Sequence, residues 1–375
     1  MQAILVGGRV GLMAVVVFAV IAPVRALADP ACDTTIRVLL ERRESAFGLV
    51  SEGRPQSFEL SPSGEFRMNG RRQKSWRSRA GQARLAGQRV PGVLSVVPLG
   101  GSLALIAEIP LETYVAGVLK GEVPAFWKAH ALQAQAVVSR SYALHQRAVN
   151  SKRAYDVEAN TRHQVFKLGP LLKPVARAVE ETRCEVLTWR GAPILAAFHS
   201  ASGGRTASAQ EVWGKHLAYL KSTEVKGEED SPDTYWREAV SRTTMSELLE
   251  AVGLGIGDVW AAQVLARSES GRVLKLRFIG SGGETRLSGG RLRSVLGESA
   301  LKSTLFELSV RDGAFVFVGS GRGHGVGMSQ WGAQGMARRG AVYTDILQSF
   351  YPGTKLKRWR GEPGDPGDPE EFAGR

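Results

Sequence analysis

The sequence predicts an α+β protein in which a strand-rich N-terminal portion leads into a mixed α/β core. Two patterns support this class. Short apolar or alternating runs, separated by turn residues, fill residues 36–109 and indicate antiparallel strands. From Leu111 the apolar spacing changes to that of a helix, and helices and strands then alternate. With 43% hydrophobic and 23% charged residues, the composition is that of a globular protein and excludes wholesale disorder.

The N-terminal strands are expected where β-branched and apolar residues cluster between turns such as Asn69-Gly70 and Pro91-Gly92. The expected strands cover residues 36–40, 57–60, 65–68, 93–97 and 103–110. Residues 71–79 hold five cations and one tryptophan. This segment is either a solvated loop or strand face or an electrostatic contact for an anionic glycan.

The helices are expected where apolar residues recur at helical spacing. A first helix covers residues 111–120 and ends at Gly121, and a second covers 127–149, after a turn at Pro124. Further along, strands are expected within 186–199, 273–279, 306–310 and 315–318, and helices over 246–252 and 330–338. Two glycine-rich loops lie between these elements, at residues 200–206 and 319–327.

The first 28 residues predict a cleaved signal peptide. Arg9 precedes an apolar run over residues 10–24, which is short for a membrane span of about 20 residues. The small residues of Ala26-Leu27-Ala28 then fit a signal-peptidase site, so the mature chain is expected to begin at Asp29. We therefore expect an exported protein of the periplasm or cell-wall space, with no stable membrane span after cleavage. An uncleaved membrane anchor is the alternative.

The formal net charge of +13 indicates an anionic partner. Two of these charges lie in the predicted signal peptide, and residues 361–375 hold five acids and one arginine, so the body between them carries +15. Because an exported protein does not meet chromosomal DNA, we expect no nucleic-acid partner and assign the charge to a polymer of the cell envelope. Export also permits a disulfide between Cys32 and Cys184, with two unpaired thiols as the alternative.

The chain divides into four expected parts: a signal peptide over residues 1–28, a strand-rich region over 29–102, a core over 103–358, and a disordered acidic tail over 359–375. Common cofactor motifs are missing from the sequence, which has no HExxH, no CxxC and no phosphate-binding G-x-x-x-x-G-K-S/T. A Ser-His-Asp hydrolase built on Ser202 and His324 lacks the GxSxG turn. We expect no cofactor.

Glu122 has a context that suits a general acid. It lies in Gly121-Glu122-Val123-Pro124, between a helix end and a helix start, with Phe126 and Trp127 close behind. Glycine lets the backbone approach a ligand, and proline stiffens the far side. A carboxyl held against apolar groups loses hydration, which favours the neutral form that protonates a glycosidic oxygen. The alternative is a surface glutamate that stabilises the dipole of the following helix.

Several motifs occur in an order and spacing that resemble the stage II sporulation protein D / amidase-enhancer family, over roughly residues 103–357. The motifs are residues 110–118 (PLETYVAGV), 121–124 (GEVP), 131–143 (ALQAQAVVSRSYA), 200–206 (SASGGRT), 212–214 (VWG), 219–220 (YL), 323–333 (GHGVGMSQWGA) and 351–354 (YPGT). The resemblance implies a lytic transglycosylase that cleaves the bond between N-acetylmuramic acid and N-acetylglucosamine in peptidoglycan strands stripped of stem peptides. The alternative that it implies is a non-catalytic partner that stimulates an N-acetylmuramoyl-L-alanine amidase.

In the family's chemistry the glutamate of the GEVP motif is the catalytic acid, and it corresponds to Glu122. This residue would protonate the leaving oxygen and then take the proton from the C6 hydroxyl of muramic acid as that oxygen attacks C1, which gives a 1,6-anhydro end. One carboxyl serves both steps, so the carboxylate pair of ordinary glycosidases is not required. Some family members carry a Cys/His zinc cluster, but the matching residues 156–166 contain only His163, so we expect no metal.

The other site residues are assigned by their place in these motifs. Arg140, on the helix after Glu122, binds the lactyl carboxylate of muramic acid or forms a structural ion pair. The first glycine loop offers sugar-binding hydroxyls, and the second offers polar groups next to Glu122, with turn capping and a structural histidine as alternatives. We expect these loops and Glu122 to converge on one substrate groove. The expected substrate-binding residues are Arg140, Ser200, Ser202, Thr206, His324, Ser329 and Gln330.

Overall fold

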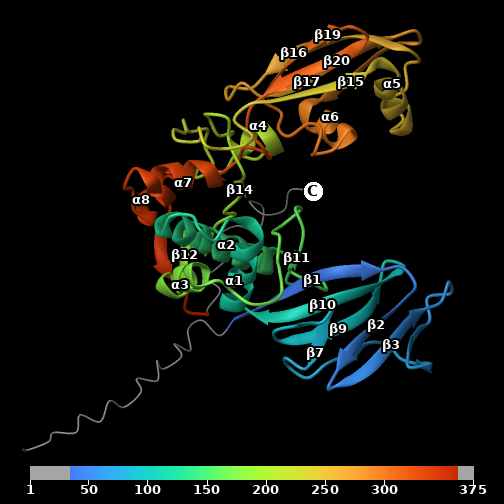
Figure 1. The fold of residues 1–375 in the computed structure, drawn as a ribbon, viewed down its shortest axis with the longest axis vertical. Helices are drawn as coiled ribbons and strands as arrows, with labels where there is room; N and C mark the ends of the chain where they lie inside the picture. The colour runs from blue at the N-terminus through green and yellow to red at the C-terminus, as the bar shows by residue number, and fades with distance from the viewer. Residues whose placement is uncertain (1–33, 362–375) are drawn as a thin grey trace, which may run out of the picture.

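The computed structural model describes residues 34–361, within which the chain forms eight helices and 22 strands in several sheets. This mixture confirms the predicted α+β class. The predicted signal peptide, Cys32 and most of the acidic tail lie outside the described residues. Within the described range, no helix has both the length and the apolar character needed to cross a bilayer. Two β-rich regions lie at opposite ends of the molecule, with most of the helices between them (Figure 1).

The N-terminal portion contains two sheets, with strand orders β11-β1-β10-β9-β6 and β5-β4-β3-β2-β7-β8. Their strands are β1 (Thr35–Arg43), β2 (Ala46–Ser51), β3 (Arg54–Leu60), β4 (Phe66–Met68), β5 (Arg71–Arg72), β6 (Trp76–Arg77), β7 (Ala83–Leu85), β8 (Gln88–Arg89), β9 (Val93–Leu99), β10 (Ser102–Pro110) and β11 (Val157–Glu158). β10 is buried on both faces, because Leu103 and Leu105 join the main core while Ala104 and Ile106 join a smaller cluster. All five strands predicted here are confirmed.

The helical core surrounds α2 (Ala129–Val149), in which every residue from Ala131 to His145 is buried. A helix that is buried all round is the centre of its domain. The helices α1 (Leu111–Glu122), α3 (Lys173–Glu181), α7 (Gln330–Arg338) and α8 (Tyr343–Phe350) pack against it. Short strands complete this part: β12 (Glu185–Trp189), β13 (Ala192–Pro193), β14 (Phe198–His199), β21 (Met328–Ser329) and β22 (Lys355–Arg358). The predicted helices over 111–120, 127–149 and 330–338 are confirmed to within two residues.

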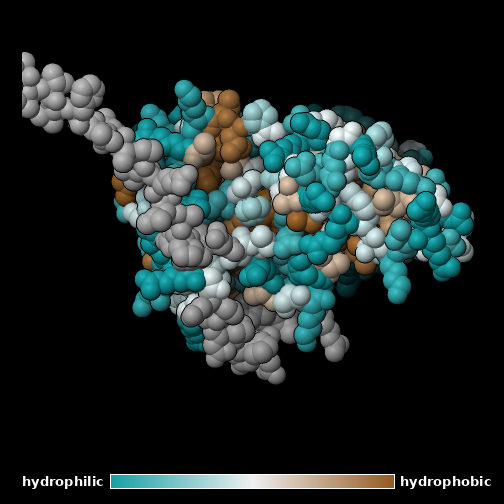
Figure 2. All heavy atoms as spheres, turned by 90° about the horizontal axis from the view of Figure 1, so that it is seen from below, coloured by the Kyte–Doolittle hydropathy of each residue, from teal (hydrophilic) through white to brown (hydrophobic). Residues whose placement is uncertain are grey.

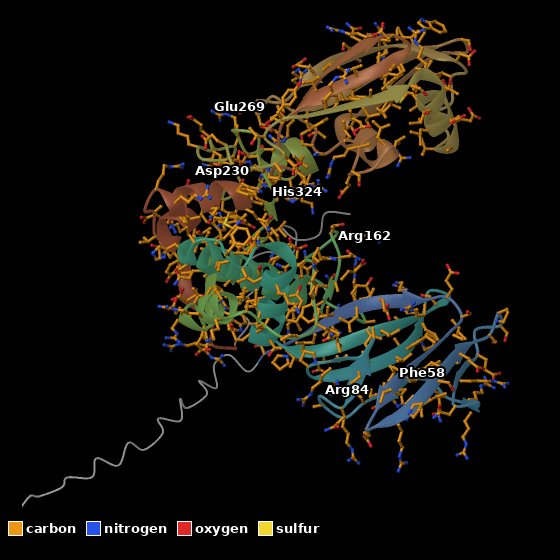
Figure 3. All side chains as sticks on the ribbon, in the orientation of Figure 1. Phe58, Arg84, Arg162, Asp230, Glu269 and His324 are labelled. Atoms are coloured by element: carbon orange, nitrogen blue, oxygen red, sulfur yellow. The ribbon has the colours of Figure 1, made fainter. Side chains whose placement is uncertain are left out.

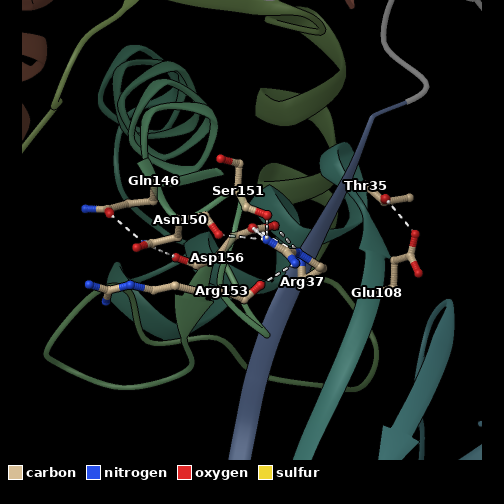
Figure 4. Close-up of polar contacts among 8 residues, drawn as sticks. All are labelled: Thr35, Arg37, Glu108, Gln146, Asn150, Ser151, Arg153 and Asp156. Atoms are coloured by element: carbon tan, nitrogen blue, oxygen red, sulfur yellow. Dashed lines mark hydrogen bonds and ion pairs between the residues drawn. The ribbon is translucent and has the colours of Figure 1, made fainter. Parts of the chain in front are cut away.

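Arg37 on β1 joins the N-terminal sheets to the chain that follows α2 (Figure 4). Its backbone N–H and its Nε donate to the two carboxylate oxygens of Asp156 at 2.8 and 3.0 Å, and its Nη2 donates to the carbonyl of Asn150 at 2.9 Å. Asp156 is buried, so this charge-assisted pair is protected from water. The contact fixes β1 against the helical core.

In the same core, Cys184 is buried and disulfide-bonded.

Residues 236–319 form an insertion with a hydrophobic core of its own. Its elements are β15 (Trp236–Ser241), α5 (Arg242–Ala251), β16 (Val259–Arg267), β17 (Val273–Gly280), β18 (Gly283–Ser288), α6 (Gly289–Leu296), β19 (Phe306–Arg311) and β20 (Ala314–Gly319). Trp236 pairs with Gly319, so the insertion leaves and returns at one point. The sequence predicted β17, β19, β20 and a helix near α5, but not a separate unit within residues 103–358.

Candidate functional site

Glu122 is the last residue of α1, one residue further than the predicted end of the helix at Gly121. Val123 is extended and closes the helix, and Pro124 prevents its continuation. Gly117 and Gly121 lie one turn apart on α1 and let another segment approach. A Cβ on Gly121 would lie 2.1 Å from the carbonyl oxygen of Val165. The glycines therefore bring residues 165–167 against the end of α1.

This close approach creates the main contact of the acid. The backbone N–H of Val165 donates to Oε1 of Glu122 at 2.6 Å. Because a backbone N–H can only donate, Oε1 accepts this hydrogen bond, which leaves Oε2 as the better position for the proton of the neutral acid. The Nε2 of Gln330 lies 3.5 Å from Oε2 and 3.5 Å from Oε1 of Gln135, so it restrains Oε2 only weakly.

Burial raises the pKa of the Glu122 carboxyl above its usual range. The hydrogen bonds from Val165 and Gln330 and the charge of Lys167 oppose this shift without cancelling it. The residue is only half-buried, so the side chain still reaches the surface. Glu122 thus combines a largely desolvated carboxyl with partial exposure of the residue.

The two glycine-rich loops cross each other. The N–H groups of Ala201 and Arg322 donate to each other's carbonyl oxygens at 3.1 and 2.8 Å. Gly321 has a φ of +76°, and a Cβ there would lie 2.7 Å from the carbonyl oxygen of Ala201. Only glycine fits such a crossing. The second loop then runs into α7, where the hydroxyl of Ser329 caps the helix by accepting from Gly332, and Gln330 follows beside Glu122.

Glu228 holds both loops, and its role was not apparent in the sequence. Its carboxylate is buried and accepts from the N–H and hydroxyl of Ser202, each at 2.6 Å, and from the N–H of Gly204 at 2.9 Å. The hydroxyl of Ser329, on the other loop, also donates to it. Four donors on one carboxylate stabilise its charge and fix the start of α7. In the sequence Glu228 is one of several acids in a turn over residues 227–232, and nothing marks it among them.

The predicted binding residues fall into two groups. Ser202, Ser329 and Gln330 lie in the network that joins Glu228 to Glu122. Ser200 is half-buried beside this network, and its carbonyl accepts from Trp331 of α7 at 3.0 Å.

The other predicted residues have structural partners. Thr206 is buried and accepts from the N–H of Thr223 at 2.8 Å, a bond that joins two segments 17 positions apart and is not the expected turn cap. Arg140 is fully buried. Its guanidinium donates to both carboxylate oxygens of Glu112 at 2.9 and 2.6 Å and to the carbonyl of Glu185 at 2.9 Å. This is the structural ion pair that the sequence left as an alternative.

His324 lies on the side of the helical core that faces the insertion (Figure 3). Its ring is 5.6 Å from that of His199 and 5.4 Å from that of Trp213. Burial, together with the charges of Arg293 and Arg272, lowers the pKa of His324 to about 4. The imidazole is therefore neutral at pH 7, and its Nδ1 accepts from the N–H of Val326 at 3.0 Å.

His163, the one histidine of the stretch that corresponds to a zinc cluster in some relatives, accepts from the N–H of Glu158 at 3.3 Å. Between residues 34 and 361, no three His, Cys, Asp or Glu side chains gather in a way that could hold a metal ion. The expectation that no metal is needed stays a prediction.

The fold and the site define an α+β protein that presents one half-buried glutamate beside two crossing glycine loops. A family model described as stage II sporulation protein matches residues 100–189, which include Glu122. A model described as a domain of unknown function matches residues 210–327, which include Glu228 and His324. The first match covers Glu122 and the helices α1 to α3, and the second covers the insertion and the whole second loop.

The relatives agree with the first model. Stage II sporulation protein D of Bacillus amyloliquefaciens is 32% identical over 269 residues, which cover 67% of this chain and 75% of that protein. An uncharacterized protein of Brachyspira hyodysenteriae is 29% identical over 269 residues, 71% of each chain. A Bacillus subtilis protein named amidase enhancer is 28% identical over 285 residues, which cover 64% of this chain and 40% of that protein. The chain belongs to the stage II sporulation protein D / amidase-enhancer family, as its motifs predict.

Proposed function

We propose that this protein is a peptidoglycan lytic transglycosylase that cleaves glycan strands stripped of stem peptides, in the periplasm or cell-wall space. The observation that carries the proposal is the state of Glu122. Its carboxyl is desolvated, its pKa is raised, and one oxygen is held by the N–H of Val165 while the other is only weakly restrained. A carboxyl whose neutral form is favoured by its surroundings and whose orientation is held by a hydrogen bond suits the first step of glycosidic cleavage.

The proposed reaction uses this one carboxyl twice. The proton on Oε2 of Glu122 passes to the oxygen that joins C1 of muramic acid to C4 of glucosamine, and the C1–O bond breaks. The resulting carboxylate takes the proton of the muramic C6 hydroxyl as its oxygen bonds to C1. The products are a free C4 hydroxyl and a 1,6-anhydro end, and Glu122 is protonated again. Glu228 is saturated by four donors and acts by holding the loops.

The charge of the protein supports stripped strands as the substrate. Removal of a stem peptide frees the lactyl carboxylate of each muramic acid, so a stripped strand is a polyanion. The body of the protein carries a net charge of +15 once the predicted signal peptide and the acidic tail are set aside. Exposed charges of opposite sign raise the association rate, and salt screens the effect. Binding should therefore weaken from low to high salt.

The test is incubation with amidase-stripped peptidoglycan, followed by mass analysis for 1,6-anhydro ends. Glu122→Gln keeps the shape of the side chain but removes its proton transfer, so product formation should fall by about 10²–10⁴-fold. Glu180→Gln is the matched control, because Glu180 lies on α3 with a side chain that is 70% exposed. Unchanged product formation by Glu122→Gln would remove this residue from the mechanism.

The alternative function is a non-catalytic partner that stimulates an N-acetylmuramoyl-L-alanine amidase. The observation that favours it is the relative named amidase enhancer. The same preparations distinguish the two functions. If the wild-type protein gives no anhydro product but accelerates amidase digestion of intact peptidoglycan, and Glu122→Gln accelerates it equally, the partner function replaces the enzymatic one.

A further inference from the structure

A cavity of about 680 Å³ lies where the N-terminal sheets meet α1, and we name it the α1 cavity. Its walls come from the β7–β8 hairpin with its flanking turns, from Thr113 and Gly117 on α1, and from residues 166–171. This volume is typical of sites that bind small ligands or parts of larger ones. Residues 166–171 directly follow Val165, whose N–H holds Glu122. The α1 cavity therefore shares a helix and a segment with the proposed acid.

The α1 cavity has a cationic lining formed by Arg84, Arg89 and Lys167, and among the described residues no Asp or Glu lines it. All three side chains are exposed. Arg84 donates from Nη1 to the carbonyl of Gly87 at 3.1 Å, and Arg89 donates from Nε to the carbonyl of Gly81 at 2.8 Å. Each guanidinium is thus oriented by its own loop and keeps N–H donors for a ligand. Figure 3 labels Arg84 on the N-terminal portion.

We propose that the α1 cavity binds a carboxylate-bearing stretch of the stripped glycan strand, distant from the bond that is cleaved. This inference deepens the proposed function and rests on it. The three cations pair with lactyl carboxylates. Leu168 and Leu171, with prolines of the lining, meet the apolar faces of the sugar rings, while the glycine-rich backbone offers N–H and carbonyl groups to hydroxyls.

An acidic peptide fits the α1 cavity less well than a glycan. A peptide gains affinity by adding a strand to an exposed sheet edge. The edge at this cavity is β8, which contains only Gln88 and Arg89. On the opposite wall, the N–H of Lys167 is already bonded to the carbonyl of Gly117 at 3.1 Å. The backbone offers too short an edge for a strand, so side-chain charge must supply the recognition.

The position of the α1 cavity lets one strand reach both sites. Thr113 precedes Glu122 by nine residues on α1, or about 14 Å along the helix axis at 1.5 Å per residue. Lys167, in the cavity lining, is close enough to Glu122 for its charge to act on that carboxyl. Seen from below, the molecule is mostly hydrophilic, with small apolar patches (Figure 2). A short run of sugars spans the distance.

The test measures binding of fluorescently labelled stripped strands to the full chain carrying Glu122→Gln, so that cleavage does not intervene. The double variant Arg84→Glu/Arg89→Glu reverses the charge of the α1 cavity. The control Arg237→Glu/Arg291→Glu makes the same change in net charge at two exposed arginines of the insertion. We expect binding about tenfold weaker for the cavity variant and within twofold for the control. Arg84→Gln/Arg89→Gln should give a smaller loss in the same direction.

A second probe is the same strands with their lactyl carboxylates amidated, which should bind weakly and equally to all variants. Equal binding of stripped strands by the cavity and control variants would overturn the inference. The inference would also be overturned if the cavity variant bound strands as before but no longer stimulated an amidase, a result that would indicate an acidic peptide partner. In the background with Glu122 intact, the cavity variant should raise KM for long strands and leave kcat unchanged. Failure of Glu122→Gln to stop cleavage would refute the proposed acid, whereas equal binding by the cavity and control variants in a background that does not cleave would refute only the site in the α1 cavity.

Discussion

Replacement of Glu228 by glutamine perturbs the network that joins the two glycine loops. Glutamine keeps the size of the side chain but turns one of two acceptor oxygens into a donor. If the amide nitrogen replaces Oε1 it meets the N–H of Ser202, and if it replaces Oε2 it meets the N–H of Gly204. The hydroxyls of Ser202 and Ser329 can rotate and accept, but a backbone N–H cannot. One backbone donor therefore loses its acceptor in either orientation: the N–H of Ser202, which is buried, or the N–H of Gly204, which is an exposed residue.

The expected cost follows from these contacts. A buried donor without an acceptor costs about 1–3 kcal/mol, and the remaining bonds lose the part of their strength that comes from the charge of Glu228, about 1 kcal/mol more. Because water can reach the N–H of Gly204, we expect the free energy of unfolding to fall by about 1–4 kcal/mol, which a domain of ordinary stability survives. Because Ser329 also caps α7, Gln330 loses its fixed position, and kcat should fall by about tenfold or more.

The assay combines urea unfolding, followed by tryptophan fluorescence, with cleavage of stripped strands. Glu229→Gln is the control, because Glu229 is the next residue and is exposed. It should change the free energy of unfolding by less than about 0.5 kcal/mol. If Glu228→Gln were as stable and as active as this control, Glu228 would not hold the loops as its four contacts indicate. If Glu228→Gln lost stability but kept its kcat, Glu228 would still hold the loops, and only the claim that it positions Gln330 would be refuted.

Three further predictions concern the same core. Gly121→Ala places a methyl group 2.1 Å from a backbone oxygen, so it should lower the free energy of unfolding by about 1–3 kcal/mol and also lower activity. Gly290→Ala on α6 should do neither, because its Cβ would meet only the hydroxyl of Ser288, at 4.0 Å. His145 and His324 have pKa values of about 4 in the folded protein, against 6.5 in the unfolded chain. The unfolded chain therefore binds more protons between these two pH values, and urea midpoints should fall as the pH is lowered from 6.5 to 4. Because the pKa of Glu122 is raised in the folded protein, the native state retains this proton at pH values above 4.5 at which the unfolded chain loses it, so this group makes the protein less stable as the pH rises. Glu122→Gln should abolish this pH dependence and be at least as stable as wild type at pH 7.

The parts of the fold that the sequence predicts are those with a local cause. The apolar stripe of α1 and the alanine-rich run of α2 give helices within two residues of their expected ends, because periodicity reports which face is buried. Around Glu122, Gly121 and Pro124 indicate the close approach and the helix end, but Phe126 is 86% exposed, and the contact that holds the carboxyl comes from Val165, 43 positions away. Strands of two residues, such as β5 and β8, have no such signal, because each is too short to show an alternating pattern, although each pairs with the strand directly before it.

The partners of the site depend on contacts between distant residues. Glu228 meets Ser329 across 101 positions of the chain, and the sequence around Glu228 offers two more acids with equal claim. The sequence could not decide between the two predicted roles of Arg140, because only the fold brings Glu112 to it. In both cases the residue type was informative, but the sequence did not indicate which residue it would contact.

The insertion shows why the two loops keep a fixed spacing although 112 residues, 207–318, separate them in the sequence and most of these fold as another unit. Trp236 and Gly319 pair where the insertion begins and ends, so the chain returns to the point it left. From inside the insertion, Arg272 then donates to the carbonyls of Ser202 and Arg205 at 2.8 and 3.0 Å. Arg272 is buried, so these bonds resist exchange with water. The insertion thus holds the first loop from one side while Glu228 holds it from the other, and the geometry around Glu122 depends on both.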